Sequence, residues 1–200
     1  MRPKLVLYSD GVIPENAPID RRMMHLIGNP SPTVAFICSS EDPEGFWFRS
    51  KAEQYAALGA RMELSFGLDD DFDPLVLPDL LACDAIHLSG GNTYGFLDRL
   101  RRRGMIDILR GYVAKGGVLI GTSAGAILMT PDISTSALCG DQNLVGMEDF
   151  SGLTLVDFLF WPHFEGGTVA MDRPVYACPD GAGVVVDGNS VELFGHVQIF

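Results

Sequence analysis

The segment G-V-L-I-G-T-S-A-G-A-I-L-M, residues 117–129, passes directly from a β-strand pattern into a helical one. Gly117–Gly121 is short and apolar, which predicts a buried strand. Ala124–Met129 predicts a helix, which Pro131 ends. A buried strand that leads straight into a helix is typical of α/β proteins built around a parallel sheet.

The same alternation of strands and helices precedes this segment. Four further strands are predicted at Lys4–Tyr8, Thr33–Cys38, Arg61–Phe66 and Ala85–Leu88. Helical patterns occur at Asp20–Ile27, Pro43–Leu58, Thr93–Arg103 and Ile106–Lys115. Downstream, Leu153–Phe160 predicts another strand, and Gly183–Phe200 breaks into short strands. We expect residues 1–200 to form a single α/β domain, with a mostly parallel central sheet and helices on both faces as a three-layer sandwich.

The composition limits the classes of partner. Hydrophobic residues make up 47% of the 200 residues, and Lys+Arg 14 against Asp+Glu 26 gives a net charge of −12. Such a charge repels phosphate backbones, so we expect no nucleic-acid partner. No apolar run reaches membrane-spanning length, and the start of the chain does not read as a secretory signal. The four cysteines have no CxxC spacing. A cytoplasmic protein with reduced thiols and no membrane segment is therefore expected.

Residues Gly121–Gly125 fit the pattern G-x-S-x-G between a strand and a helix. In that context the serine stands at a sharp turn, where its hydroxyl can act as a nucleophile. The alternative is a tight turn of small residues in which Ser123 caps the helix. Because the strand and the helix both flank the motif, we favour Ser123 as a catalytic nucleophile.

A catalytic serine needs a base, and the sequence contains four histidines. His87 lies within an apolar strand, so it is expected to be a core residue. His25 and His196 have no motif around them. His163 follows the apolar run at Leu153–Phe160, and catalytic groups often follow strand ends, so His163 is the expected base.

Two carboxylates are candidates for the acid that orients His163. In an extended segment residues i and i+2 face the same side, which favours Glu165. Asp141, in the loop after the serine helix, is the alternative. A backbone amide in the Gly90–Gly91 turn, together with that of Ala124, could stabilise an oxyanion. The turn is not a G-x-G-x-x-G pattern, and the sequence shows no metal-ligand cluster, so neither a metal nor an organic cofactor is expected.

Three segments together resemble the peptidase E family of serine peptidases. They are D-A-I-H-L-S-G-G-N-T at residues 84–93, G-T-S-A-G-A at residues 121–126 and P-H-F at residues 162–164. The resemblance implies a flavodoxin-like α/β sandwich related to class I glutamine amidotransferases. It also implies Ser123 as nucleophile, His163 as base, and an oxyanion hole formed by the amides of Gly91 and Ala124.

The same resemblance bears on the acid and on the substrate. Peptidase E takes its acid from the loop after the serine helix, where this chain has Asp141. The His-x-Glu order at His163 and Glu165 is similar to that of the amidotransferases. The family's arginine- and glutamate-rich segment beyond the histidine has no clear counterpart here, and Arg173 is the one basic residue between Glu165 and Pro179.

We therefore expect a serine peptidase that acts on dipeptides or short peptides, with acidic residues as a candidate preference. Two alternatives remain open. An esterase-type hydrolase would use the same serine with Asp141 as its acid. A non-catalytic, amidotransferase-like module would bind a ligand or a partner instead. The aromatic runs at residues 46–48 and 158–161 leave a homo-oligomer open.

Overall fold

Seven strands form the central sheet of the computed structural model, which describes residues 2–11 and 13–200. Their order across the sheet is β3-β2-β4-β5-β1-β8-β9. The bounds are β1 (Lys4–Tyr8), β2 (Thr33–Ile37), β3 (Arg61–Phe66), β4 (Ala85–Leu88), β5 (Val118–Thr122), β8 (Gly183–Asp187) and β9 (Ser190–Phe194). The first five strands pair in parallel, and β8 and β9 add an antiparallel edge next to β1. The predicted sheet, mostly parallel, is confirmed.

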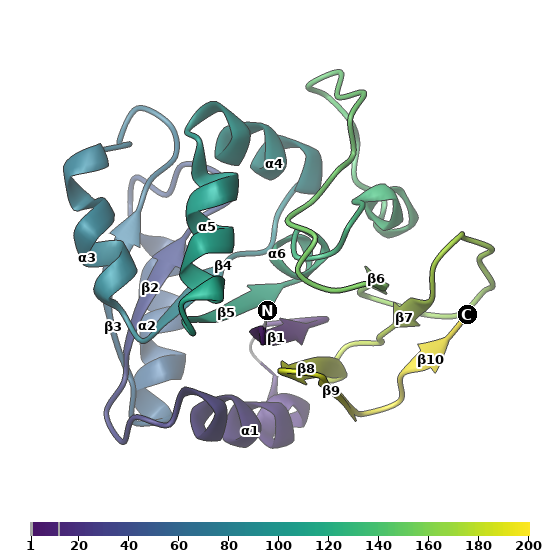
Figure 1. The fold of residues 1–200 in the computed structure, drawn as a ribbon, viewed down its shortest axis with the longest axis horizontal. Coiled ribbons are helices and arrows are strands. Elements are labelled where there is room, and N and C mark those ends of the chain that lie inside the picture. Colours follow the sequence, from purple (N-terminus) through teal and green to yellow (C-terminus); the bar gives the residue numbers. More distant parts are fainter. Residues whose placement is uncertain (1, 12) are drawn as a thin grey trace.

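Helices cover both faces of this sheet (Figure 1). They are α1 (Ala17–Ile27), α2 (Phe46–Ala57), α3 (Leu77–Ala82), α4 (Thr93–Arg102), α5 (Met105–Ala114) and α6 (Ala124–Ile127). In Figure 1, α1 lies below the sheet and α4 and α5 lie above it. Within residues 2–11 and 13–200, no helix is both long enough and apolar enough to cross a membrane.

The alternation of side chains along each strand explains the two helical layers. In β1, Leu5 and Leu7 pack into a core that includes residues of α3, α4, α5 and α6. Val6 and Tyr8 point the other way, into a core shared with α1 and α2. The inner strands β1, β2, β4 and β5 are buried on both faces, which explains why their sequences are continuous apolar runs.

A second, smaller sheet contributes to the site described below. It has three strands in the order β10-β7-β6, with bounds β6 (Leu159–Trp161), β7 (Val175–Ala177) and β10 (Gln198–Ile199). Strands β6 and β7 are parallel, and Trp161 is the register partner of Ala177. Their carboxyl ends therefore lie at the same edge. This sheet is at the right of Figure 1, beside the end of the chain.

The structure corrects two expectations in this part of the fold. The predicted strand at Leu153–Phe160 is present only as β6, because residues 153–155 donate their backbone hydrogen bonds to the carbonyl groups of residues 128–130 after α6. The left-handed backbone of Thr154, with φ of 52°, also prevents an extended strand there. Helix α3 and strand β7 were not predicted, because neither short element carries a readable hydrophobic period.

Candidate active site

Ser123 stands at the sharp turn that the sequence predicts. Strand β5 ends at Thr122 and α6 begins at Ala124, so Ser123 is the residue between them. Its φ of 50° and ψ of −110° are unusual for a residue with a side chain. The amide of Ser123 donates to the carbonyl oxygen of Tyr8 at 2.9 Å, which ties the turn to β1. This backbone geometry is that of a nucleophile elbow.

Glycines on both sides of Ser123 allow the elbow to pack tightly. A Cβ on Gly125 would collide with the backbone of Leu88 in β4. A Cβ on Gly121 would collide with the backbone of Gly125. The G-x-S-x-G pattern therefore has a steric cause, since only glycine lets β4, β5 and α6 approach this closely.

His163 lies within hydrogen-bond distance of Ser123. Its Nε2 is 2.9 Å from the Oγ of Ser123, although the two residues are 40 positions apart in the chain. The backbone amide of His163 donates to the Oγ of Ser9 at 2.8 Å, just beyond β1. With the side chain of His163 41% exposed, substrate can reach the pair from solvent. The structure thus brings together the predicted nucleophile and base.

The carboxylate at the other ring nitrogen belongs to Asp180. Its Oδ1 is 2.7 Å from the Nδ1 of His163. His163 follows β6 and Asp180 follows β7, so the parallel pairing of these strands brings the two loops together. Asp180 was not predicted. The only signal in the sequence was the turn Pro179-Asp180-Gly181, which by itself indicates a reversal of the chain rather than a catalytic acid.

Neither predicted acid occupies this position. The argument for Glu165 required an extended backbone, but His163 has φ of 53°, so residues 163 and 165 do not share a face. Glu165 is exposed and makes no side-chain hydrogen bond or ion pair with another described residue. Asp141 instead accepts the amide hydrogen of Thr93 at 2.8 Å, at the start of α4. Its carboxylate therefore stabilises the loop that carries the glycine pair.

The Gly90–Gly91 turn lies beside Ser123. A Cβ on Gly90 would be 3.7 Å from the Cβ of Ser123. Gly91 has φ of 130°, and a Cβ there would collide with Ser39. The amides of Gly91 and Ala124 donate no hydrogen bond to any other described residue. Both are therefore free to donate to a bound oxygen atom.

His87 is a core residue, as the sequence predicts. Its Nδ1 is 2.7 Å from the hydroxyl of Tyr55, and its Nε2 is 3.1 Å from the Oγ1 of Thr122. Burial lowers the pKa of His87 well below its usual value, with a smaller contribution from the nearby charge of Lys51. His87 is consequently a neutral hydrogen-bonding group beneath the elbow.

A cavity of about 510 Å³ opens next to Ser123 and His163. The ends of the parallel strands β1, β2, β4 and β5 border it, and α2 forms one wall with Trp47, Ser50 and Lys51. The crevice at the carboxyl ends of parallel strands is the usual ligand site of an α/β sheet. Among the described residues, no cluster of three or more His, Cys, Asp or Glu side chains is suited to hold a metal ion.

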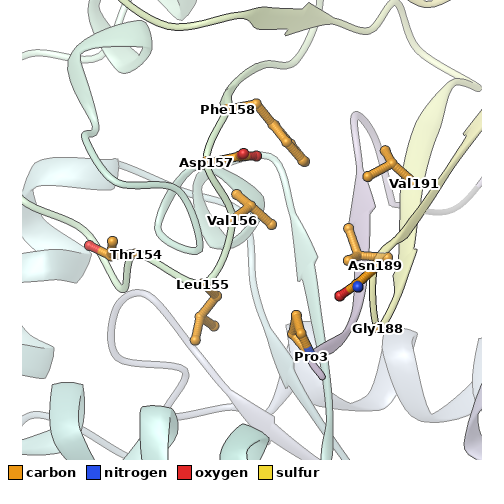
Figure 2. Close-up of a pocket in the computed structure, with 10 residues that line it drawn as sticks. Pro3, Thr154, Leu155, Val156, Asp157, Phe158, Gly188, Asn189 and Val191 are labelled. Atoms are coloured by element: carbon orange, nitrogen blue, oxygen red, sulfur yellow. The ribbon is translucent and has the colours of Figure 1, made fainter. Parts of the chain in front are cut away.

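A second cavity, of about 420 Å³, lies at the opposite end of the sheet (Figure 2). Pro3, just before β1, and Asn189, between β8 and β9, border it together with residues 154–158. Among the described residues that line it, Asp157 is the one titratable side chain. These lining residues include no nucleophile paired with a base, so the candidate active site is the cavity at Ser123.

Several known proteins are similar to this chain in sequence. The sequence profile of peptidase family S51 matches residues 5–194. An uncharacterized peptidase of Listeria monocytogenes is 31% identical over 137 residues, which are 66% of this chain and 65% of that protein. The peptidase E of Salmonella typhimurium is 34% identical over 113 residues, which are 56% of this chain and 46% of that protein. The chain thus matches less than two thirds of the length of either relative.

Two solved structures have the same fold. A candidate peptidase E protein from Listeria monocytogenes EGD-e superposes with a TM-score of 0.76 at 24% identity, covering 96% of this chain and 98% of that one. A peptidase from an acI-B1 actinobacterium superposes with a TM-score of 0.72 at 18% identity, covering 100% of this chain and 94% of that one. At these identities the likeness establishes the α/β sandwich.

Proposed function

The chain belongs to peptidase family S51, and on this basis we propose that it is a serine peptidase that hydrolyses dipeptides or short peptides. The observation that carries the proposal is the distance of 2.9 Å between the Oγ of Ser123 and the Nε2 of His163. Such a distance allows the serine hydroxyl to donate its proton to the imidazole as it attacks.

The reaction proceeds in two stages. The Oγ of Ser123 attacks the scissile carbonyl carbon, and its proton passes to the Nε2 of His163. The C–N bond then breaks, and His163 returns the proton to the leaving amine, which leaves an ester on Ser123. Water, deprotonated by His163, hydrolyses that ester and releases the acid and the free serine.

Asp180 is the acid that orients the imidazole in this proposal. Its Oδ1, 2.7 Å from the Nδ1 of His163, accepts the hydrogen of that nitrogen and so leaves Nε2 free to accept the serine proton. The same carboxylate stabilises the imidazolium that forms during attack. The amides of Gly91 and Ala124 are the proposed donors to the oxyanion, and their lack of acceptors among the described residues supports this.

A preference for acidic residues is part of the proposal. Arg173, the one basic residue between Glu165 and Pro179, is exposed and does not line the cavity at Ser123. A residue that binds an acidic side chain of the substrate therefore has to be sought among the residues that line the cavity. A cytoplasmic location and a homo-oligomer stay predictions.

Hydrolysis of a panel of dipeptides and aminoacyl amides tests the proposal. Wild type should release free amino acids, and Ser123→Ala should lower kcat by about 10⁴-fold or more. Ser190→Ala, at an exposed serine of β9, is the matched control and should cleave like wild type. Equal cleavage by wild type and Ser123→Ala would contradict the assignment of the nucleophile. Turnover of simple esters without peptide cleavage would favour an esterase instead.

A further inference from the structure

The cavity at Ser123 is lined by a lysine side chain that is largely protonated at neutral pH. Among its lining residues, Lys51 is the one lysine or arginine, and Asp10 is the one aspartate or glutamate. Hydroxyl groups of several serines and the rings of Phe36 and Trp47 make up much of the remaining surface. The lining residues therefore place one ammonium group and one carboxylate among mostly neutral side chains, inside a chain whose net charge is −12.

The position of this ammonium group is fixed by neighbouring residues. The Nζ of Lys51 donates to the Oε1 of Gln54 at 3.0 Å, and the Nε2 of Gln54 donates to the carbonyl oxygen of Gly11 at 3.1 Å. A Cβ on Gly11 would lie 2.8 Å from Nζ and 3.6 Å from the Cγ2 of Thr122. The ammonium group thus lies against Gly11, which follows β1, in the cavity that Thr122 and Ser123 also line.

Lys51 has no carboxylate partner in the described protein. No aspartate or glutamate oxygen among residues 2–11 and 13–200 lies within 4.0 Å of its Nζ, although its side chain is partly buried. Asp20, one of the two acids whose charge reaches it, already accepts the hydroxyl of Tyr8 at 2.8 Å. Of its three hydrogens, one is accounted for by Gln54, and two have no acceptor among the described residues.

Burying a cation without an anion is costly. That cost is visible in the pKa of Lys51, which burial lowers to about 8 against the opposing influence of Asp10 and Asp20. An anion from a ligand would remove the imbalance by accepting the free ammonium hydrogens. A single ammonium group, with hydroxyl neighbours and the carboxylate of Asp10 in the same lining, suits a monoanion better than a multiply charged group such as a phosphate.

We propose that Lys51 binds a carboxylate group of the peptide substrate and is a specificity-determining residue of this site. The inference rests on the proposed peptidase function, since it takes the cavity at Ser123 as the substrate site. A peptide offers this chemistry from two sources, an acidic side chain or the C-terminal carboxylate. Either would be held by a charge-assisted hydrogen bond to the Nζ of Lys51, in the cavity that Ser123 also lines.

Binding can be measured apart from turnover, by titration calorimetry in the Ser123→Ala background. Three probes separate the two carboxylates: Asp-Leu, Asn-Leu, which lacks the side-chain carboxylate, and Asp-Leu amide, which lacks the terminal one. Adding Lys51→Met should weaken binding of Asp-Leu by about 10–100-fold, the range for a hydrogen bond to a charged group. Lys51→Arg should recover part of the loss. Lys115→Met, at an exposed lysine outside this cavity, is the matched control and should change nothing.

The pattern across the probes decides the outcome. If Lys51 binds the side chain, Lys51→Met should leave the already weak binding of Asn-Leu unchanged. If Lys51 binds the C-terminal carboxylate, Lys51→Met should leave the binding of Asp-Leu amide unchanged. An equal loss for all three probes, no loss for any, or no binding of any probe before Lys51 is changed would overturn the inference. Carboxylate-dependent binding without hydrolysis by wild type would contradict the proposed function but would still show that Lys51 binds a peptide carboxylate.

Discussion

Ser123 and His163 share an unusual backbone conformation. Their φ values of 50° and 53° lie in the left-handed region, which residues with a Cβ rarely adopt. A hydrogen bond from its own backbone amide holds each residue in this conformation. Ser123 donates to the carbonyl oxygen of Tyr8 at the end of β1, and His163 donates to the Oγ of Ser9 just beyond it. Strain of this kind costs about 1–3 kcal/mol per residue and is concentrated at functional sites. Here it aims both reacting side chains into one cavity.

Replacing the carboxylate at Asp180 tests its role as the orienting acid. Asp180→Asn keeps the size of the side chain but removes the charge that stabilises the imidazolium, so kcat should fall by about 10²–10⁴-fold. Asp141→Asn keeps an oxygen that can accept the amide hydrogen of Thr93 and removes only the charge at the start of α4. It should cost less than about 1 kcal/mol of stability and change kcat by less than about 10-fold. Steady-state kinetics with thermal melts measure both effects.

A larger loss of kcat for Asp141→Asn or for Glu165→Gln than for Asp180→Asn would contradict this assignment.

The sequence predicted two of the three residues at this site. Ser123 and His163 were predictable because each stands in a short motif with its own structural context. The acid was not, because Asp180 reaches His163 only through the pairing of β6 with β7, and because the left-handed His163 removes the expected neighbour, Glu165.

At the scale of elements, Ser9 joins the two sheets of the molecule. It follows β1 in the central sheet, and its buried Oγ accepts the amide hydrogen of His163 and donates to the carbonyl oxygen of Cys178, both at 2.8 Å. His163 follows β6 and Cys178 follows β7, so one hydroxyl group holds the ends of both strands. The loops that carry His163 and Asp180 are thereby fixed to the sheet that carries Ser123.

The close packing of α6 against β4 predicts an asymmetry between two glycines. Gly125→Ala should destabilise the protein by about 1–3 kcal/mol and lower kcat, because the new Cβ meets the backbone of Leu88 and displaces the elbow. Gly111→Ala, in the middle of α5, meets nothing within 4 Å. It should stabilise the protein by up to about 1 kcal/mol with unchanged activity. Denaturant melts that give the two variants equal stability would contradict this packing argument.

The sequence predicted the elements that have a clear hydrophobic pattern and missed the short ones that lack it. Strands β1 to β5 have four to six residues, and all were predicted; β1, β2, β4 and β5 are buried on both faces or nearly so, whereas the edge strand β3 alternates between buried and exposed residues. The three-residue strand β7 carries no readable period, so its role in placing Asp180 was invisible. Leu153, Leu155 and Phe158 are buried, as their apolar character suggests, but in a turn-rich segment packed into the core rather than in a strand. In residues 153–158 the apolar sequence correctly predicted buried side chains but did not predict the backbone conformation.

At the scale of the whole molecule, Lys51 makes stability depend on pH. Burial lowers its pKa to about 8, whereas a lysine in an unfolded chain titrates near about 10.4. Between these values the unfolded chain binds more protons, so the contribution of Lys51 to the free energy of unfolding rises with pH. Its destabilising effect is fully present below pH 8 and is lost as the pH approaches about 10.4.

Lys51→Met should therefore be more stable than wild type at neutral pH. A gain on the order of 1 kcal/mol would raise Tm by about 2–4 °C for a chain of this size. The difference in Tm between the two proteins should shrink as the pH rises from about 8 to about 10.4. Thermal melts across this range, with Lys115→Met as control, measure it. A difference that is constant with pH would mean that the ammonium of Lys51 is not destabilised by the fold.

The central claim is that Ser123 is a nucleophile activated by His163, and covalent labelling tests it most directly. A fluorophosphonate reagent followed by peptide mass spectrometry should find one adduct, on Ser123, in the wild-type protein. Labelling should disappear in Ser123→Ala and slow by at least about 100-fold in His163→Gln, which removes the base. An adduct on another serine, no adduct at all, or labelling of His163→Gln at the wild-type rate would contradict the account.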